Sequence, residues 1–447
     1  MRTAYVATIA QTPSADRLEV IPGAVVVVDD AGEITGVERH GTKEADGALG
    51  SVDQVVHLRD TELLLPGLVD LHVHAPQWPQ LGVGLDLPLE RWLFEHTFPL
   101  EARYTDASFA ARVWADLVGT LLRHGTTTAV YFGTNDTAAT TALAAEAVQQ
   151  GQRAFVGRVA MDHPEGTPEW YRDPSATAGV EASARSIEEI RALDDGSGRV
   201  RPIVTPRFLP ACTDALLAGL GELAAATGTL VQTHCSESDW EHAHALDRFG
   251  ITDTTALDRF GLLRPGTVLA HGNHVTDDDG ALIRTRRSGI AHCPLSNSYF
   301  ANAVLPVRRL LAAGVPMGLG TDIAGGATAG MLRQCHEAVT ASRLLTDGVD
   351  ARCAPSERGV PGSAIDTVTA FWLATLGGAE VLGIPVGLLA PGRRFDAFAV
   401  DTASAAGALR VWPEVDDAAR TFEKVVRLAG PSDITRVWVD GREIVEA

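Results

Sequence analysis

The sequence predicts an α/β protein: a (β/α)8 TIM-type barrel with a small β-sandwich built from both chain termini. Two observations lead to this fold class. Between residues 66 and 384, short apolar runs alternate with long stretches rich in Ala, Leu and Arg, and such alternation is typical of a parallel sheet with helices between its strands. At both ends of the chain, the pattern changes to short β-rich segments.

The barrel strands are expected in eight short apolar runs, most of them followed by a helical stretch. In chain order they are VDLHVH, GTTTAVYFG, RAFVGRVAMD, RPIVTPRF, LVQTHCSE, TVLAHGN, GIAHCPLSN and VPMGLGTDIAGG. Eight such units indicate a TIM-type barrel. The clearest irregular stretch is residues 348–362.

The two chain ends supply the strands of the predicted β-sandwich. AVVVVDD and EITGVERH are separated by the turn Ala31-Gly32, and ITRVWVDGREIV, which follows FDAFAVD, contains the hairpin signal Asp440-Gly441. Each end alone is too short to close a core. We therefore predict that residues 1–65 and 385–447 form one composite β-sandwich and that residues 66–384 form the barrel.

Composition and charge exclude several classes of protein. The 447 residues carry a formal net charge of −20, and an acidic surface repels phosphate backbones, so we expect no nucleic-acid partner. The five cysteines are scattered and form no CxxC pair, which argues against a disulfide framework or a structural zinc knot. The start of the chain does not resemble a signal peptide, and no segment approaches about 18 uncharged apolar residues. We expect no membrane partner and a cytoplasmic location.

The segment PGLVDLHVHAP places two imidazoles two residues apart in an apolar run. In a β-strand, residues i and i+2 point to the same face, so His72 and His74 would project side by side and could hold one metal ion. The pair falls at the C-terminal end of its strand, where α/β barrels keep their active sites. The alternative is two core histidines that are satisfied by hydrogen bonds.

Further side chains of the metal-ligand types fall near the ends of later strands, which a TIM barrel brings to one mouth. They are His234 and Glu237 on the fifth strand candidate, His271 on the sixth, His292 on the seventh and Asp322 on the eighth. Three or four imidazoles with one carboxylate suit Zn²⁺, with Fe²⁺ as the second choice. Any one of these histidines could be structural, but their joint occurrence favours a metal site.

Two of the acidic residues are candidates for moving protons. Glu237 lies just past the strand that carries His234, so it can face a metal-bound water without ligating the ion, and we expect it to act as a proton shuttle. The alternative is a solvated loop carboxylate. Asp322 ends its strand, where it can touch the metal and accept a proton from the attacking water.

Taken together, these motifs resemble the amidohydrolase superfamily and, within it, the guanine deaminases. The resemblance spans most of the chain. HxH, HG and GTD are shared across the superfamily and say little about the substrate. PQ after HxHA, the WLFEHTFP segment and TPRF discriminate better between the members of the superfamily. In chain order, the segments that resemble the family are PGLVDLHVHAPQ, DLPLERWLFEHTFPLEARYTD at residues 86–106, GQRAFVGRVAMD, VTPRF, HCSE, LAHG, AHCPLSN and GLGTDIAGG.

The resemblance implies a role for each residue of the site. It implies one Zn²⁺ held by His72, His74, His234 and Asp322, with His271 as a further ligand or as a hydrogen-bond partner of the water. It implies Glu237 as general acid and base, and Gln77, Arg207 and Phe208 as contacts to a purine. Some related hydrolases bridge two metal ions with a carbamylated lysine on the fourth strand. RPIVTPRF holds no lysine, which favours a single ion.

The chemistry of these side chains is consistent with purine binding. A guanidinium such as that of Arg207 can donate to a ring carbonyl, and the carboxamide of Gln77 can both donate and accept. Phe208 offers an apolar contact to the ring plane. Trp92 is a candidate for covering the mouth of the barrel, although a tryptophan in an amphipathic stretch is more often a core residue. Arg207 could instead form a surface salt bridge.

We therefore predict zinc-dependent hydrolytic deamination of guanine to xanthine and ammonia through metal-activated water. The first alternative keeps this mechanism and changes the ring to a pterin, 8-oxoguanine or an aminotriazine. A second is hydrolysis of a cyclic amide or an imidazolone, and a third is a metal-binding scaffold without catalysis. The partner is then a small purine-like molecule, and the resemblance further implies a homodimer.

Overall fold

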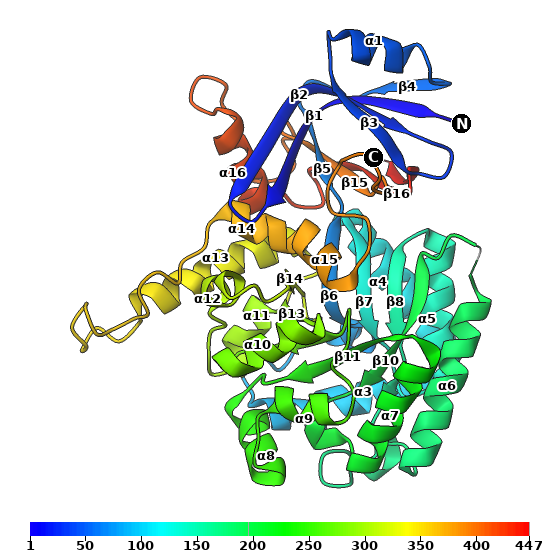
Figure 1. Ribbon diagram of the computed structural model, residues 1–447, viewed down its shortest axis with the longest axis vertical. Helices are drawn as coiled ribbons and strands as arrows, with labels where there is room; N and C mark the ends of the chain where they lie inside the picture. Colours follow the sequence, from blue (N-terminus) through cyan, green and yellow to red (C-terminus); the bar gives the residue numbers. More distant parts are fainter. Residues whose placement is uncertain (195, 447) are drawn as a thin grey trace.

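Eight parallel strands form the barrel that the sequence predicts. The computed structural model describes residues 1–194 and 196–446, and each of the eight predicted runs coincides closely with one barrel strand (Figure 1). A short strand, β9 (Val159–Ala160), follows the third barrel strand in the chain and pairs with β10. In the order of the sheet, the barrel strands are β6 (Leu68–His74), β7 (Thr126–Phe132), β8 (Arg153–Gly157), β10 (Val200–Pro206), β11 (Leu230–Cys235), β12 (Val268–His271), β13 (Gly289–His292) and β14 (Met317–Leu319).

The barrel closes between its first and last strands just beyond the end of β14. The backbone N–H of Asp322 donates to the carbonyl of His72 at 2.8 Å, and the N–H of His74 donates to the carbonyl of Ile323 at 2.9 Å. These two bonds place the residues after β14 beside the C-terminal half of β6. The two ends of the barrel sequence, about 250 residues apart, therefore meet at one edge of the mouth.

Helices cover the outside of the barrel, and several begin and end with ordinary capping residues. The Asp106 side chain accepts from the backbone N–H groups of Ser108 and Phe109 at the start of α4, and Gly151 ends α5 in the left-handed region. The helices of the barrel are α4 (Ala107–Arg123), α5 (Thr137–Gln150), α6 (Ala176–Ala192), α7 (Asp214–Thr227), α8 (Asp239–Phe249), α9 (Asp253–Arg259), α10 (Asp277–Arg286), α11 (Pro294–Phe300), α12 (Val307–Ala312), α13 (Met331–Asp347), α14 (Thr367–Trp372) and α15 (Gly378–Leu382).

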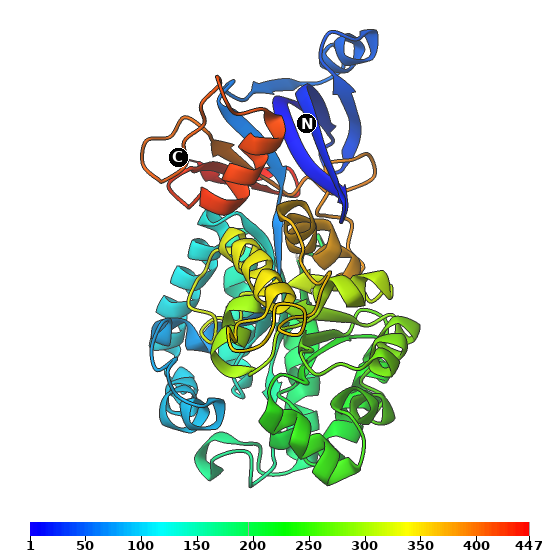
Figure 2. The same cartoon turned by 90° about the vertical axis from the view of Figure 1, so that its left-hand side faces the viewer.

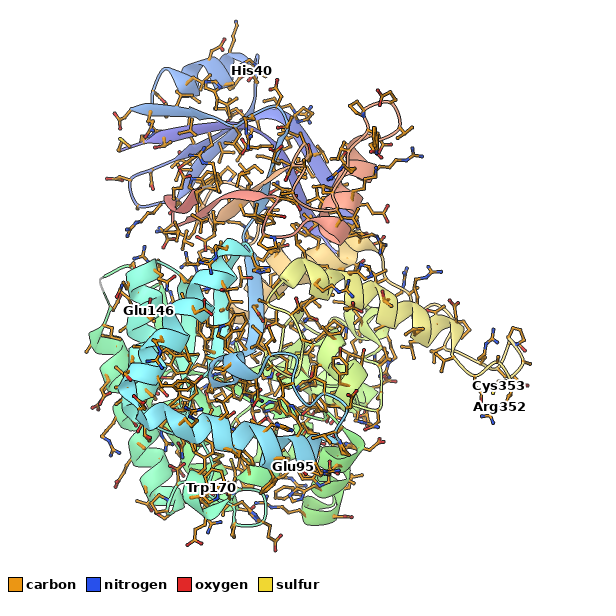
Figure 3. The ribbon with its side chains drawn as sticks, turned by 180° about the vertical axis from the view of Figure 1, so that it is seen from behind. His40, Glu95, Glu146, Trp170, Arg352 and Cys353 are labelled. Carbon is orange, nitrogen blue, oxygen red and sulfur yellow. The ribbon has the colours of Figure 1, made fainter. Side chains whose placement is uncertain are left out.

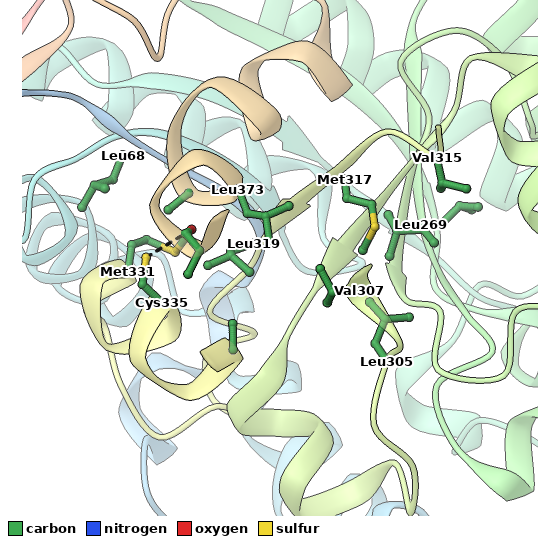
Figure 4. Packing of buried hydrophobic residues seen from close by; sticks show 14 of the residues in the cluster. Leu68, Leu269, Leu305, Val307, Val315, Met317, Leu319, Met331, Cys335 and Leu373 are labelled. Carbon is green, nitrogen blue, oxygen red and sulfur yellow. Dashed lines mark hydrogen bonds between the residues drawn. The ribbon is translucent and has the colours of Figure 1, made fainter. Parts of the chain in front are cut away.

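Apolar packing holds the last barrel strand in place. Met317 and Leu319 of β14 lie in one buried cluster with Leu269 of β12 and with Met331 of α13 (Figure 4). Each of these side chains is completely or almost completely removed from solvent. Because β14 is only three residues long, this packing, rather than a long hydrogen-bonded ladder, fixes the direction in which the chain leaves the strand.

The chain termini build one eight-stranded sheet at the other end of the molecule (Figures 1 and 2). β5 of the N-terminal part pairs with β15 of the C-terminal part, so neither end forms this sheet alone. The sheet order is β17 (Arg442–Glu446), β16 (Ile434–Val439), β15 (Ala397–Asp401), β5 (Glu62–Pro66), β1 (Thr3–Ser14), β2 (Arg17–Val28) and β3 (Ile34–Arg39), with β4 (Gln54–His57) paired to β1; α1 (Lys43–Leu49) and α16 (Ala418–Leu428) belong to the same segments.

This sheet curls over and encloses its own core, as a β-sandwich does. Tyr5 of β1 stacks on Phe395 with ring centroids 4.5 Å apart and meets the edge of Trp438 of β16 at 5.6 Å. In the sheet, β5 and β15 lie between β1 and β16, and neighbouring strands are about 4.8 Å apart. A flat sheet would keep Tyr5 and Trp438 well apart, so their contact requires the curl. The predicted fold class is thus confirmed.

The strands of this sheet differ in length from the prediction. β1 and β2 each have 12 residues and form one long hairpin, where the sequence predicts short strands. The far end of the hairpin rests on the barrel, where the hydroxyl of Thr369 on α14 donates to the carbonyl of Ala15 at 2.8 Å. A contact with a helix more than 350 residues away supports the extra length, and local sequence pattern carries no signal for it.

The region predicted to be irregular, residues 348–362, contains no helix or strand. It projects from the end of α13, and Arg352 and Cys353 lie at its tip (Figure 3). In the part of the chain that the structure describes, no helix combines the length and apolarity needed to cross a membrane.

Candidate metal centre and substrate cavity

Three predicted metal ligands converge from two barrel strands. His72 and His74 lie on the same face of β6, and their ring centroids are 4.8 Å apart. His234 of β11 reaches the same point, with its Nε2 atom 2.9 Å from Nε2 of His74. One nitrogen of each of the three rings lies within 4.8 Å of the others, a spacing suited to a shared ion.

The predicted carboxylate ligand completes the group from the last strand. Oδ1 of Asp322 lies 3.1 Å from Nε2 of His72 and 3.6 Å from Nε2 of His74. Asp322 has a φ of 50°, in the region of backbone conformation that residues other than glycine rarely adopt. Its backbone bond to His72 holds it in this conformation, and such local strain is often found at functional sites.

His271 faces the same point from β12, with a slightly larger separation. Its Nε2 atom lies 3.9 Å from Oδ2 of Asp322 and 3.7 Å from Oε1 of Glu237. His271, His72 and Asp322 form a second group whose ligand atoms all lie within 4.8 Å of one another. His271 can therefore serve as a further ligand or as a partner of a water, and both alternatives from the sequence stay open.

The bonding state of these rings fits a cation. Nδ1 of His234 lies 2.6 Å from the carbonyl oxygen of Arg207, so it carries the proton and leaves Nε2 with a free lone pair. In the same way, Nδ1 of His271 donates to Oδ1 of Asn297 at 2.9 Å. Nε2 of His271 and Nε2 of His72 are buried without a hydrogen bond. Unpaired lone pairs that face one another in a buried site are unfavourable, and a metal ion would satisfy them.

Burial keeps the imidazoles neutral, as metal ligands must be. Desolvation lowers the pKa of His74 and of His234 well below the usual value, and the neighbouring histidines lower it further. Desolvation also lowers the pKa of His72 and His271. By contrast, the pKa of Asp322 falls to about 2 because His72 and its other polar neighbours outweigh desolvation. The centre therefore offers neutral rings and one carboxylate.

Glu237 lies inside the site and not on a solvated loop. It is 5% exposed and lies two residues before the start of α8, and the alternative of a solvated carboxylate is therefore wrong. Its backbone is held on both sides: its N–H donates to Oε2 of Glu241 at 2.8 Å, and its carbonyl accepts from Nδ2 of Asn273 at 2.8 Å. Burial, together with the charge of Asp322, raises the pKa of Glu237 well above its usual range.

A chain of hydrogen bonds connects Glu237 to His271. Asn273, which holds the carbonyl of Glu237, accepts at Oδ1 from Nδ2 of Asn297 at 2.8 Å. Asn297 in turn accepts from His271. Each amide in this chain has one orientation, because turning either one would place two donors or two acceptors against each other. The chain thereby fixes the tautomer of His271 and the backbone position of Glu237 together.

A cavity opens beside these side chains. All four residues that the sequence predicts as substrate contacts line it, together with several apolar residues that sequence reasoning missed. The lining residues are His74, Gln77, Leu89, Trp92, Leu93, Arg207, Phe208, His234, Glu237, Phe300, Asp322 and Gly325.

Aromatic side chains line part of this cavity. Trp92 is only 3% exposed, and its ring centroid lies 5.2 Å from that of Phe300. Its indole N–H donates to the carbonyl of Val83 at 2.9 Å, which fixes the ring in place. The ring centroid of Phe208 lies 5.9 Å from that of His234 and 5.8 Å from that of Trp240. Both predicted aromatic residues are thus buried and reach the cavity.

Arg207 is buried and belongs to the cavity. It is 2% exposed, and its guanidinium makes a two-pronged ion pair with Glu101, with Nη1–Oε2 at 2.6 Å and Nη2–Oε1 at 3.1 Å. The alternative of a surface salt bridge is therefore wrong. Nε2 of Gln77 donates to the same carboxylate at 3.0 Å.

Sequence reasoning missed several residues that support the site. It also grouped His292 with the candidate ligands, although the structure places this residue outside both groups. Asp70 lies on β6 two residues before His72, so the spacing that pointed to His72 and His74 was a usable signal for it. Glu101, Asn273 and Asn297 had no such signal. His292 is buried on β13 but does not belong to either group of candidate ligands found among the described residues.

The fold and the site together define a class of protein. Four side chains of ligand type and a buried acid meet at the C-terminal mouth of a parallel barrel, which is the arrangement of a barrel hydrolase with a candidate metal centre. Residues 63–444 match the model of the Amidohydrolase family. The chain therefore belongs to the amidohydrolase family.

The known proteins that resemble this chain include guanine deaminases. A probable guanine deaminase of Schizosaccharomyces pombe is 36% identical over 447 residues, which cover 98% of this chain and 82% of the relative. The crystal structure of guanine deaminase from C. acetobutylicum with bound guanine superimposes with a TM-score of 0.88 at 28% identity and covers 99% of this chain and 100% of that one. An adenosine deaminase from Xanthomonas campestris with bound zinc gives a TM-score of 0.82 at 25% identity, with 100% of this chain and 92% of that one covered. The chain is a guanine deaminase-like enzyme.

Proposed function

We propose that this enzyme catalyses the zinc-dependent hydrolytic deamination of guanine to xanthine and ammonia. The observation that carries the proposal is one shared cavity. Gln77, Arg207 and Phe208 line it together with a second group, the candidate ligand His74 and the acid Glu237. A flat heterocycle held by the first group lies against the second. The similarity to guanine deaminases, one of them solved with bound guanine, supports guanine as that ring.

The ligand set suits one Zn²⁺ ion. When bound, this ion supplies a Lewis acid that lowers the pKa of a coordinated water to about 7. The zinc in a solved adenosine deaminase of similar fold supports this choice, and Fe²⁺ is the second candidate. The absence of lysine from β10 supports a single ion. The residues that would hold it are His72, His74, His234 and Asp322, with His271 as a fifth ligand or as the partner of the water.

Binding of the ring falls to three side chains. Arg207 donates to the ring carbonyl, since three of its five N–H groups are not used by Glu101. Gln77 contributes an amide donor beside it. Phe208 covers a face of the ring, and the apolar side of the cavity excludes water from the reacting atoms.

Glu237 and Asp322 move the protons. Glu237 takes one proton from the attacking water and passes it to the ring nitrogen beside C2. The oxygen of water forms a bond to C2, and the bond from C2 to the exocyclic nitrogen breaks. Asp322 and Glu237 carry the second proton of the water to the departing amine, which leaves as ammonia. One water proton thus remains on xanthine and the other departs with ammonia.

The test is a direct assay on the zinc-loaded protein. Loss of guanine absorbance with equal release of ammonia is expected. Glu237→Gln should retain its zinc and lose about 10²–10⁴-fold in kcat. Asp239→Asn is the matched control, because Asp239 lies two residues away with an exposed side chain, and it should keep full activity. A zinc-loaded wild type without either signal would exclude guanine as the substrate, and a fully active Glu237→Gln would exclude the proton shuttle.

The alternative substrates give different outcomes in the same assay. Faster turnover of a pterin, 8-oxoguanine or an aminotriazine than of guanine would identify a different substrate and leave the proposed mechanism unchanged. Ring opening without ammonia would indicate a cyclic-amide or imidazolone hydrolase. A protein that binds zinc but turns over no member of this panel would be a metal-binding scaffold.

The proposal extends to organisation and assembly. We propose residues 66–384 as the catalytic unit and residues 1–65 with 385–447 as an accessory unit, and we propose a homodimer. Light scattering at several protein concentrations tests the assembly state, and a constant mass of one chain, 47.2 kDa, would exclude the dimer.

A further inference from the structure

Glu101 is a buried carboxylate bonded to two polar residues that line the cavity. It is the last residue of α3 (Phe98–Glu101), within the segment that runs from β6 to α4, and it is 1% exposed. Its two oxygens accept three hydrogen bonds, two from Arg207 and one from Gln77. Both donors line the cavity. One carboxylate therefore holds the two polar side chains that face the ring.

Glu101 cancels the charge of Arg207. An unpaired guanidinium in a dry cavity would attract anions strongly, because charges interact through a low effective dielectric there. The two-pronged contact with Glu101 uses two of the five N–H groups of Arg207. The other three remain hydrogen-bond donors in an ion pair that has no net charge. The ring of Phe98 lies under the guanidinium at 4.9 Å and closes off solvent on that side. Arg207 thus offers hydrogen bonds without a net charge.

Glu101 also fixes the orientation of Gln77. Nε2 of Gln77 donates to Glu101 at 3.0 Å, while Oε1 accepts from the backbone N–H of Ala324 at 3.1 Å. A turned amide would place its oxygen against a carboxylate and its NH₂ against an N–H group. The second N–H of Nε2 therefore stays available to a ligand as a donor.

The other titratable groups that face this ion pair carry no charge. Tyr171 and Tyr104 face Glu101, and burial raises the pKa of both hydroxyls. Burial raises the pKa of the Cys212 thiol, which faces Arg207, to about 12, and it lowers the pKa of His74. The Glu237 carboxylate also interacts with the Arg207 guanidinium, and burial together with the charge of Asp322 raises its pKa well above the usual range.

We infer that Glu101 is a specificity-determining residue, which sets the substrate-binding side of the cavity to accept a neutral ring carbonyl and to gain nothing from a negative charge on the ring. The inference rests on the proposed function. Deamination replaces the amine by a second carbonyl and puts a proton on the neighbouring nitrogen, so the product is a stronger acid than the substrate. An unpaired Arg207 would retain the ionised product. The pair with Glu101 removes that attraction and favours release.

The experiment measures product binding, which needs no turnover. Isothermal calorimetry gives the Kd of xanthine for the zinc-loaded wild type at about pH 6 and about pH 9, below and above ionisation of the product. The wild type should bind xanthine no more tightly at the higher pH. In Glu101→Gln, which keeps the shape and removes the charge, Kd should fall at least about tenfold between the two pH values.

The kinetic prediction separates specificity from structural support. The variant should show a several-fold higher KM for guanine, because Gln77 loses its fixed orientation, and a smaller change in kcat. Glu95→Gln is the matched control on the same segment: Glu95 is exposed and paired with Arg91 at 2.8 Å, and this variant should behave as the wild type (Figure 3). Near-identical zinc content and circular dichroism establish that each variant is folded.

Two outcomes would overturn the inference. One is a folded Glu101→Gln whose ratio of Kd values at the two pH values equals that of the wild type. The other needs no variant: a wild type that binds xanthine ten times more tightly at the higher pH, which decides the matter even if Glu101→Gln does not fold. A wild type that binds neither guanine nor xanthine refutes the proposed function instead, so the two failures are distinguishable.

Discussion

The carboxylate of Asp70, on the first barrel strand, is hydrogen-bonded to Thr321, which lies two residues past the end of the last barrel strand. Oδ1 accepts from the backbone N–H of Thr321 at 2.9 Å, and Oδ2 accepts from its hydroxyl at 2.6 Å. Oδ1 also lies 3.2 Å from the backbone N–H of His72. Because His72 and Asp322 are both candidate metal ligands, this one side chain sets the distance between two of them.

Removing this carboxylate should loosen the metal centre. In Asp70→Ala, the backbone N–H groups of His72 and Thr321 lose their buried acceptor. We expect the affinity for Zn²⁺ to fall about 10–100-fold, as for other residues that support metal ligands. The free energy of unfolding should fall by about 1–3 kcal/mol per unpaired group. Competition with a chromogenic chelator measures the affinity. Asp70→Asn keeps an acceptor oxygen and should lose less, and equal affinities in both variants and the wild type would contradict the prediction.

The hydrogen bond between Asn297 and His271 should matter for turnover more than for metal content. Asn297→Ala removes the acceptor that keeps the proton on Nδ1 of His271 and breaks the chain to Asn273. We expect kcat to fall about 10–100-fold while the protein keeps one zinc per chain. Ser298→Ala changes the next residue of α11, which bonds only to the helix backbone, and should have little effect. Full activity of Asn297→Ala would mean that His271 needs no such support.

Metal removal should destabilise the whole barrel. The ligands come from β6, β11 and the end of β14, so an ion that binds the folded chain links distant parts of it. Binding to the native state alone adds about 2.7 kcal/mol at a concentration 100 times Kd. We expect a chelator to lower Tm by several degrees and Zn²⁺ to restore it. Mg²⁺ should not, because it prefers oxygen ligands. An unchanged Tm after verified loss of metal would argue against a shared site.

The contact between the barrel and the terminal sheet depends on Arg153. It begins β8, and its guanidinium lies 3.0 Å from Oδ2 of Asp396 and 2.6 Å from Oδ1 of Asp440, with all three side chains buried. Arg153→Met leaves two buried carboxylates without this partner and should cost about 3–5 kcal/mol in urea unfolding. Activity at 25 °C should survive in the protein that remains folded, because Arg153 lies at the end of the barrel away from the metal ligands.

The control for this variant is an exposed ion pair. Arg91→Met removes the surface partner of Glu95 and should change the free energy of unfolding by less than about 1 kcal/mol. Equal losses in Arg91→Met and Arg153→Met would contradict the role given to the buried network.

Much of the fold could be predicted from the sequence because its signals are local. Each of the eight apolar runs became a barrel strand, since a buried parallel strand requires an apolar run of that length. His72 and His74 share a face because side chains alternate along any strand. The 12-residue strands β1 and β2 could not be predicted in the same way, because their outer halves rest on α14, far away in the sequence.

The sequence by itself determined which residue types stand at the strand ends, and hence the candidate ligand set, and its resemblance to guanine deaminases added Gln77 and Arg207 to the site. Only the tertiary structure decided how these side chains are paired. Glu101 lies 106 residues from Arg207, and Asp70 lies 251 residues from Thr321. A hydrogen bond depends on ångström-scale distance and direction, which closure of the barrel sets and which no local pattern encodes. The charge of the cavity and the tautomer of each ring follow from those pairings.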